Sequence, residues 1–394
     1  MSRLDELIKS LCPDGVEFKP LSEVATLKRG ARITKKQLVT DGDYFVISGG
    51  TEPMGKYTDF NRDANVITIS SYGATGYVDY KKYRFWANDV CLTVQCTGIF
   101  DKFLYYYLKS KQDYIYSNTT KAIPDHIPTD FLLDLSIPIP PLEVQQEIAR
   151  LLDDFAAKTE ELQTELNKEY EVRKKQYEYY RDTLLTRNEQ IPRVKLCDIA
   201  TSLYRGAGIK RDQVTEKGIP CVRYGEIYTT YDTCFNDCVS HTDEKYLASP
   251  KFFEHGDILF AITGESVEDI AKSIAYLGHD KCLAGGDIVV MKHNQNPRYL
   301  AHVLSTGMAR AQKSKGKVKN KVVHSSVPSI EQIEIPLPSL DDQKKYADIL
   351  DGFYSALNQL QSELPAEIES RQKQYEFYRD KLLTFKELNE SEVN

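Results

Sequence analysis

Residues 176–186 read QYEYYRDTLLT and residues 374–384 read QYEFYRDKLLT, so two stretches 198 residues apart differ at only two of eleven positions. The match extends outward at the same offset without a gap. Residues 137–186 agree with residues 335–384 at 26 of 50 positions. Agreement of this extent is not produced by chance and indicates an internal duplication of a structural unit.

The duplicated segment has the periodicity of a long helix. Apolar side chains recur at steps of three and four in both copies, as in Ile148, Leu152 and Phe155, which is typical of a coiled-coil seam. Two ordinary amphipathic helices on a globular core remain the alternative interpretation. An IPxP segment precedes each copy and predicts a rigid, extended entry into the helix. Pro365 lies inside the second copy, where it predicts a kink.

The net charge of −7 is concentrated in the duplicated helices. Residues 142–186 carry 11 acidic and 7 basic side chains, and residues 340–384 carry 9 and 6, so the rest of the chain sums to zero. The overall balance argues against a nonspecific nucleic-acid coat protein. Acidic helices are also poor candidates for contact with DNA, although a solvated helix face would have the same composition.

The segments between the helices, 16–136 and 191–334, are rich in short strand-like runs such as YFVIS and GDIVVMK, separated by glycine-containing turns. Each has a predicted helix in its last third, at 103–111 and 298–312. We therefore expect two α/β (α+β) domains of similar plan. Their sequences match only weakly, so the helices stayed alike while the globular domains diverged. The predicted division is a first globular domain at 1–140, a first helix at 141–190, a second globular domain at 191–338 and a second helix at 339–394.

Basic residues cluster locally in both globular segments. Such clusters suit contacts with phosphates and base edges, although runs of charge are more often a solvated surface. KRGARITKK covers 28–36, and KSKGKVKNK (313–321) places a lysine at every second position. The predicted DNA contacts from these clusters are Lys28, Arg29, Arg32 and Lys35 in the first segment and Arg205, Lys210, Arg211, Arg223, Lys313, Lys315, Lys317 and Lys319 in the second.

The sequence lacks the common motifs of catalysis and metal binding. The chain has no GxxxxGK[ST] phosphate loop and no GxGxxG after a strand. Asn296-Pro297-Arg298-Tyr299 lacks the second proline of the amino-methyltransferase motif. Eight cysteines without a CxxC pair predict buried, reduced thiols and no metal site. No apolar run reaches the length of a membrane span and the start lacks a signal core, so we expect no catalytic residue, no membrane association and a cytoplasmic location.

Two diverged domains, each followed by a similar helix that opens with IPxPxLxxQ and ends in QYExYRDxLLT, resemble the specificity (S) subunit of Type I restriction-modification enzymes. The resemblance covers nearly the whole chain. It implies two target recognition domains that each read one half of a split double-stranded DNA site, and spacer helices packed as an antiparallel coiled coil with pseudo-two-fold symmetry.

The same resemblance implies how the work is divided among subunits. Methylation would belong to two modification subunits, and cleavage to restriction (translocase) subunits, which would hold S-adenosylmethionine, ATP and Mg. The family's glycine-containing recognition loop resembles SYGATG (71–76), which makes Tyr72 a DNA-contact candidate, and ITGES (262–266), where Glu265 departs from the pattern. The predicted partner-binding residues of the helix repeats are Gln145, Tyr177, Tyr180, Arg181, Gln343, Tyr375, Tyr378 and Arg379.

Two other functions remain open from the sequence. A solitary DNA-binding regulator could read a split site without enzyme partners. An enzyme, such as the specificity half of a fused nuclease-methyltransferase, is disfavoured by the missing catalytic motifs. The base sequence of the DNA target does not follow from the side chains.

Overall fold

The computed structural model describes residues 3–120, 123–246, 249–264, 270–313, 317–319 and 322–388, with the backbone alone at 244, 317–319 and 322. The chain forms two compact units. One unit comprises Met1–Glu165 with Pro365–Asn394, and the other comprises Leu166–Leu364. Each unit therefore contains one globular head, the part of one long helix that adjoins it and the far part of the other long helix.

The two long helices are α6 (Leu142–Thr186) and α12 (Leu340–Leu382), of 45 and 43 residues. Both correspond to the duplicated segments, which confirms the prediction of long helices. Pro365 lies inside α12, and the helix continues through it. Because proline has no N–H, the backbone bond to the carbonyl four residues earlier is missing there. The kink expected at this residue stays a prediction.

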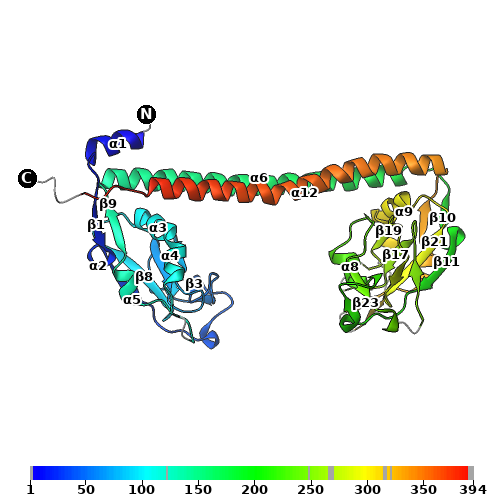
Figure 1. The fold of residues 1–394 in the computed structure, drawn as a ribbon, viewed down its shortest axis with the longest axis horizontal. Helices are drawn as coiled ribbons and strands as arrows, with labels where there is room; N and C mark the ends of the chain where they lie inside the picture. The colour runs from blue at the N-terminus through cyan, green and yellow to red at the C-terminus, as the bar shows by residue number, and fades with distance from the viewer. Residues whose placement is uncertain are drawn as a thin grey trace, which may run out of the picture. The chain divides into compact units, whose positions relative to one another are not determined.

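Aromatic contacts show how the helices pair within each unit. In the first unit the Phe155 ring of α6 lies 5.7 Å from the Tyr375 ring of α12. In the second unit the Tyr177 ring lies 5.5 Å from the Tyr354 ring. In both units an early part of one helix packs against a late part of the other, as expected for an antiparallel pair, and within each unit the two helix segments lie side by side (Figure 1).

The first head is built on a four-stranded antiparallel sheet in the order β2-β8-β5-β6 and a three-stranded sheet in the order β4-β3-β7, in which β3 and β7 are parallel. Helix α3 lies beside the larger sheet in Figure 1 and buries Phe103, Leu104 and Leu108 in the core. The bounds are α1 Arg3–Leu11, β1 Glu17–Pro20, α2 Leu21–Val24, β2 Ala25–Arg29, η1 Lys35–Gln37, β3 Tyr44–Ile47, β4 Gly55–Tyr57, β5 Val66–Ser70, β6 Val78–Lys81, β7 Phe85–Ala87, β8 Cys91–Cys96, α3 Asp101–Ser110, α4 Gln112–Ser117, α5 Thr129–Leu133 and β9 Ser136–Ile139.

The second head has two five-stranded sheets, β11-β21-β17-β19-β14 and β12-β15-β13-β20-β16, and a three-stranded sheet β18-β23-β22. Its bounds are β10 Arg193–Lys195, α7 Leu196–Ile199, β11 Ala200–Arg205, η2 Arg211–Gln213, β12 Val214–Thr215, β13 Ile219–Val222, α8 Tyr224–Thr229, β14 Cys234–Phe235, β15 Ser240–Thr242, η3 Glu244–Tyr246, β16 Phe252–Phe253, β17 Ile258–Ala261, β18 Thr263–Gly264, β19 Ser273–Tyr276, β20 Cys282–Ala284, β21 Ile288–His293, α9 Pro297–Leu304, α10 Gly307–Lys313, β22 Lys317–Lys319, β23 Val322–His324, α11 Val327–Glu331 and β24 Glu334–Pro336.

The two heads share one plan despite their weak sequence match. The order β2-β8-β5-β6 of the first corresponds to β11-β21-β17-β19 of the second, and the parallel pair of β3 with β7 in the first head has a counterpart in β13 with β20 of the second. The second head has a further parallel pair, β14 with β19. Each head is also closed by a two-stranded antiparallel ladder, β1 with β9 and β10 with β24, directly before its long helix. The mixed α/β architecture with an internal repeat is therefore confirmed.

All eight cysteines are free. Four are buried, at positions 12, 91, 221 and 282, while Cys197 is exposed, so the expectation of buried thiols holds only in part. None of the helices in the described ranges is both long and apolar enough to cross a membrane.

Candidate nucleic-acid interface

The basic segment 28–36 of the first head is held in a fixed conformation. The buried Asn88 side chain accepts from the Ile33 N–H at 2.7 Å and donates to the Ile33 carbonyl at 3.2 Å. Trp86 Nε1 donates to the Ala31 carbonyl at 2.8 Å. Gly30 lies so close to the Ala87 carbonyl that a Cβ would meet it at 2.1 Å, which explains the glycine. The predicted contacts Lys28, Arg29, Arg32 and Lys35 are therefore exposed on an anchored segment.

A cleft of about 350 Å³ in this head is lined by Lys28 and by Arg62, which the sequence analysis missed. Arg62 is fixed by three neutral acceptors. Its Nε donates to Thr93 Oγ1, and its two terminal nitrogens donate to the carbonyls of Asn61 and Arg29, all at 2.7–2.8 Å. Burial lowers the pKa of this guanidinium, and the nearby Cys91 opposes that shift. A fixed cation without a carboxylate among these bonds suits a DNA phosphate.

The loop 71–76 has a backbone that requires its glycines. Gly73 has φ +87°, and a Cβ there would meet the Gly49 carbonyl at 2.5 Å. The N–H of Ala74 donates to the same carbonyl at 2.6 Å. Tyr72 is half-buried and stacks on His126, with ring centroids 5.8 Å apart. The loop is therefore closely packed, and Tyr72 keeps only part of its surface accessible.

The second head has a cleft of about 510 Å³ lined by Arg211, Arg223, Tyr224, Asp287 and several glycines. Two arginines at this cleft are paired with carboxylates, unlike Arg62 of the first head. Arg223 pairs with the buried Glu226 at 2.7 Å, and Glu226 also accepts from Ser240 Oγ. Arg205, beside this cleft, pairs with Asp287 at 2.5 Å. The predicted contacts Lys210 and Arg211 are exposed at η2.

The structure describes only part of the lysine row 313–321. The predicted DNA contact at Lys313 is wrong. Its side chain is only 6% exposed, and its Nζ donates to Ser273 Oγ at 2.9 Å and to the Leu304 carbonyl at 2.8 Å. A side chain held in this way does not contact DNA. Lys315 and Glu265 lie outside the described residues, as do the side chains of Lys317 and Lys319, whose backbone forms β22.

Two of the predicted partner-binding residues are also corrected. Gln145 is 2% exposed, accepts from the Phe100 N–H at 2.8 Å and donates to the Pro140 carbonyl at 2.7 Å. Gln343 is 1% exposed, accepts from the Asn296 N–H at 3.0 Å and donates to the Pro338 carbonyl at 2.9 Å. The glutamine of IPxPxLxxQ therefore joins the start of each long helix to its own head.

The remaining repeat residues divide into inner and outer positions. Tyr177 is buried against His302, with its hydroxyl 3.1 Å from Nδ1, and Arg181 is buried beside Asp182. Tyr375 and Arg379 are mostly covered in the other unit. The outer positions carry large exposed aromatic side chains, with exposed fractions of 56% at Tyr179, 55% at Tyr180, 63% at Phe377 and 42% at Tyr378.

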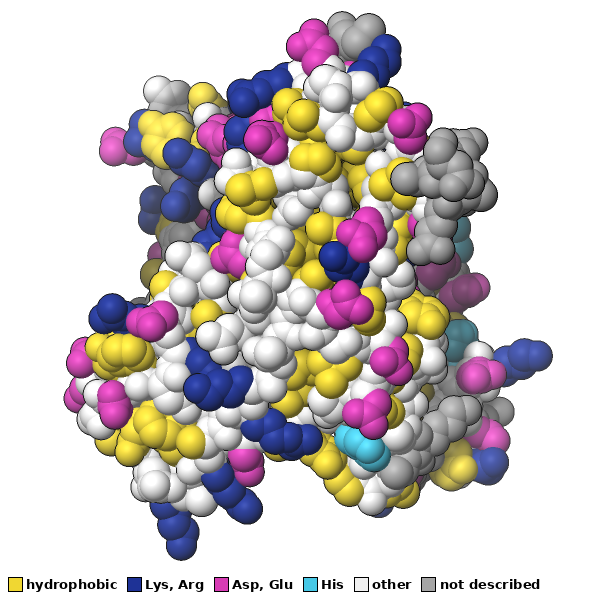
Figure 2. All heavy atoms as spheres, turned by 90° about the vertical axis from the view of Figure 1, so that its left-hand side faces the viewer, with side chains coloured by type: hydrophobic (Ala, Val, Ile, Leu, Met, Phe, Trp, Pro, Cys, Tyr) yellow, Lys and Arg dark blue, Asp and Glu magenta, His cyan; other side chains and the backbone are white. Residues whose placement is uncertain are grey.

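The distribution of charge and the possibility of a metal site both bear on function. On the face drawn in Figure 2, Lys and Arg side chains lie among Asp, Glu and apolar ones, and several of them gather at its lower left. Within the part of the chain that the structure describes, no group of three or more His, Cys, Asp or Glu side chains is placed to hold a metal ion.

Comparisons with known proteins identify the family. The family described as Type I restriction modification DNA specificity domain matches residues 13–172 and 188–370, one copy for each half. The chain is 27% identical over 416 residues to the Type I restriction enzyme EcoR124I/EcoR124II specificity subunit of Escherichia coli, covering 98% of both chains.

Solved structures agree in fold. A chain from a structure on complex assembly and conformational transition of the type I R-M system is matched with a TM-score of 0.69 and 14% identity, over 95% of this chain and 98% of that chain. The HsdS subunit from Thermoanaerobacter tengcongensis is matched with a TM-score of 0.54 and 14% identity, over 95% of this chain and 99% of that one. The two heads, the duplicated helices and these matches together show that the chain belongs to the specificity subunits of Type I restriction-modification systems.

Proposed function

We propose that this chain reads a bipartite, asymmetric DNA target, with one half-site for each head, and directs modification and restriction subunits to it without catalysing a reaction itself. The observation that carries the proposal is the pair of heads with one strand order and different clefts. A shared plan with equivalent attachment gives both heads the same way of meeting DNA. Different side chains in the clefts give each head its own sequence preference.

In the first head, the contacts with DNA are assigned to Lys28, Arg29, Arg32, Lys35 and Arg62, with Tyr72 at the edge of its loop. In the second head they are assigned to Lys210, Arg211 and Tyr224. Arg205 holds Asp287, which can accept from cytosine N4, whereas Arg223 is oriented by the buried Glu226. Lys315, Lys317 and Lys319 stay candidates for phosphate contacts.

The exposed aromatic positions of the helices are proposed as docking sites for two modification subunits. Tyr179 and Tyr180 in the second unit correspond by the repeat to Phe377 and Tyr378 in the first. Exposed aromatic clusters of this kind are characteristic of protein interfaces. Since the two sites are equivalent by duplication, each should hold one modification subunit. S-adenosylmethionine, ATP and Mg are assigned to the partner subunits, and the complex to the cytoplasm.

The docking assignment has a direct test. Tyr180→Ala and Tyr378→Ala should each reduce the complex from two modification subunits to one, as measured by native mass spectrometry, and the double variant should bind none. A single variant that still binds two subunits with unchanged affinity contradicts the assignment.

The functional test uses the purified chain with and without its modification subunit. We expect methyl transfer from S-adenosylmethionine to DNA only when both are present, and site-specific DNA binding that is much tighter for the complex than for the chain alone. Equally tight, site-specific binding by the chain alone would favour the solitary regulator instead. Methyl transfer by the chain alone would show that it is an enzyme.

A further inference from the structure

Two segments of the second head cross side by side from one five-stranded sheet to the other. The first segment runs from β14 to β15, and the second runs from β19 to β20. Strands β14 and β19 are parallel neighbours in one sheet, while β15 and β20 both pair with β13 in the other. The two crossing segments therefore start together and end on either side of the same strand.

The crossing segments stay in contact beyond the strands from which they start. The Leu277 N–H donates to the Phe235 carbonyl at 2.8 Å. One residue further along both segments, a Cβ at Gly278 would meet the Asn236 carbonyl at 1.9 Å, so the close approach leaves no room for a side chain. This contact brings both segments to the same part of the core.

Each crossing segment carries one cysteine at this place. Cys238 stands two residues before β15, and Cys282 is the first residue of β20. Both thiols pack in one apolar cluster, in which Cys282 is 1% exposed and Cys238 is half-buried. The Cys238 thiol donates a hydrogen bond to the Cys282 sulfur, which also lies 3.3 Å from the Tyr276 hydroxyl. The two sulfur atoms are therefore neighbours in the folded chain.

Cys221 of β13, the other thiol in this region, faces away from the pair. In the parallel ladder of β13 with β20, Cys221 is opposite Leu283, and Val222 is opposite Ala284. Successive side chains of a strand point to opposite faces of the sheet. Val222, Ala284 and Cys282 belong to the same apolar cluster, so Cys221 and Leu283 point to the other face. The cysteine pair therefore has a defined membership.

The two thiols of the pair differ in acidity. The hydrogen bond from Cys238 lowers the pKa of Cys282 below the ordinary value of 9.0; burial opposes this shift, and the hydrogen bond with the Tyr276 hydroxyl supports it. The same contact between the thiols, together with burial, raises the pKa of Cys238. Since the thiolate is the form that reacts with oxidants, Cys282 is the nucleophile and Cys238 is the thiol that follows it.

We propose that Cys238 and Cys282 form a reversible disulfide when the protein meets hydrogen peroxide. The Cys282 thiolate attacks one peroxide oxygen, the O–O bond breaks, and the sulfenic acid forms as hydroxide leaves and takes up a proton. Cys238 then attacks the sulfenic sulfur, so that the S–S bond forms, the S–O bond breaks and a second water leaves with the Cys238 proton. The thiols together lose two electrons, which reduce the peroxide to water.

The cross-link would act on the cleft of the second head, and this part of the inference rests on the proposed reading of DNA. Gly285, three residues after Cys282, lines that cleft. Ser240 of β15 donates to Glu226, which holds Arg223 of the same cleft. Drawing the two sulfurs to a bond length of about 2.0 Å shifts the strands on either side of β13. Oxidation should therefore weaken the reading of one half-site, and a thiol reductant should restore it.

The first test is peptide mapping of the full-length chain by mass spectrometry after treatment with hydrogen peroxide. We expect one cross-linked peptide pair, Cys238 with Cys282, which dithiothreitol separates. Cys238→Ser should trap Cys282 as a sulfenic acid that dimedone labels, and Cys282→Ala should give neither product. The matched control is Cys197→Ser, which removes an exposed thiol outside the pair and should leave the cross-link unchanged. Absence of the cross-link, or a cross-link through Cys221 instead, overturns the proposal.

The second test measures methylation after the chain has been oxidised alone, freed of peroxide and mixed with its modification subunit. Oxidation should slow methyl transfer to DNA severalfold in the wild-type chain and in Cys197→Ser, and dithiothreitol should reverse the loss. Cys282→Ala should be insensitive to the treatment. A cross-link that forms without slowing methylation overturns the regulatory part. Failure of the proposed function looks different, since the reduced complex would then transfer no methyl groups at all.

Discussion

The two units fasten the same duplicated helix to different heads. Asp153 of α6 accepts from Lys102 and from the Tyr106 hydroxyl, while Asp351, its equivalent 198 residues later, accepts from Arg298 at 2.5 Å and from His302 Nε2 at 2.7 Å. The aspartate acceptor is therefore the same in both helices. In each head its partners are a cationic side chain and a second donor one helical turn further along the same helix.

This comparison shows which parts of the molecule can vary. The attachment of each head constrains only the chemistry of a few helix positions, so the identity of the donors can drift. The clefts that we propose to face DNA are under no such constraint from the helices. Under the proposed function, a duplicated scaffold with two different heads would allow two unlike half-sites to be read.

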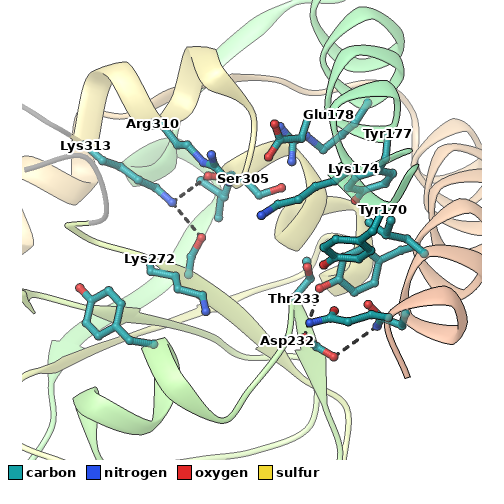
Figure 3. Close-up of a pocket in the computed structure, with 18 of the residues that line it drawn as sticks. Tyr170, Lys174, Tyr177, Glu178, Asp232, Thr233, Lys272, Ser305, Arg310 and Lys313 are labelled. Carbon is teal, nitrogen blue, oxygen red and sulfur yellow. Dashed lines mark hydrogen bonds between the residues drawn. The ribbon is translucent and has the colours of Figure 1, made fainter. Parts of the chain in front are cut away.

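The largest expected difference between the units concerns two lysines whose pKa is lowered by burial. The half-buried Lys109 of the first unit donates to the Val78 carbonyl, and burial lowers its pKa; the buried Lys313 of the second unit (Figure 3) has a larger shift, to about 7. Between about pH 7 and the ordinary lysine pKa of 10.5, the unfolded chain holds a proton that the folded site lacks. The free energy of unfolding should therefore rise with pH, by at most about 1.4 kcal/mol per pH unit.

Urea unfolding followed by circular dichroism at pH 7 and pH 9 measures this slope. Lys313→Met should flatten it and should stabilise the second unit at pH 7 by about 2–4 kcal/mol, because the cost of burying a charge is removed. Lys109→Met should flatten it less. If stability depends equally on pH in the wild-type chain and in Lys313→Met, the lowered pKa of Lys313 is contradicted.

The glutamines at the helix starts should be equivalent in the two units. Gln145→Leu leaves the Phe100 N–H and the Pro140 carbonyl without their partner, so the first unit should lose about 3 kcal/mol. Trp86 is the sole tryptophan of the chain, and its fluorescence reports the first head. Gln145→Leu should shift that transition, and Gln343→Leu should affect it much less.

The exposed neighbour provides the matched control, since Gln146→Leu changes the same side chain one position along α6. We expect its effect to stay within about 0.5 kcal/mol. If Gln146→Leu and Gln145→Leu shift the Trp86 transition equally, the buried hydrogen bonds are not what holds the helix start.

A smaller effect on stability is expected at Asp351, the aspartate that attaches α12 to the second head. Burial tends to raise the pKa of Asp351, but the hydrogen bonds from His302 and Arg298 outweigh it and lower the pKa below its ordinary value of 3.8. The stability contributed by the charged form is therefore present above that value and is lost as pH falls below it.

Asp351→Asn should cost about 1–2 kcal/mol at pH 7 and less at pH 3, as measured by urea unfolding. The equivalent change Asp153→Asn should destabilise the first unit and shift the Trp86 transition. An effect of Asp351→Asn that is equally large at pH 3 and pH 7 would show that the carboxylate charge is not involved.

The arginines of the two clefts should differ in their contribution to DNA binding. Arg62 is held by neutral acceptors, whereas Arg205 is paired with Asp287. With the modification subunit present, Arg62→Ala should reduce the slope of log affinity against log salt by about 1. Arg205→Ala should reduce it by less than half as much. Equal changes would show that the ion pair opens on binding.

The repeat itself was readable from the sequence because it is a local, periodic pattern, and the long helices followed from it. The shared strand order of the heads was not readable, since strand pairing is set by contacts between distant residues. The glutamine of IPxPxLxxQ looked like a surface motif because a repeated polar residue gives no indication of burial.

The candidate site was predicted unevenly for similar reasons. The segment 28–36 was recognisable from its charge density, and the structure places it on the surface. Arg62 was missed because it stands alone in NRD, where nothing in the sequence marks its three acceptors. Lys313 was misassigned because the alternating lysines suggest one exposed face, whereas the first of them closes α10 and is buried.

The most direct test of the central claim is to map every methylated site in cells that express the chain with its modification subunit. The wild-type chain should give two short conserved blocks of sequence separated by a fixed unspecified gap. Arg211→Ala combined with Tyr224→Ala, which alters only the cleft of the second head, should relax one block and leave the other block and the gap unchanged. A single continuous motif, or relaxation of both blocks by this change, would contradict the account that each head reads its own half-site.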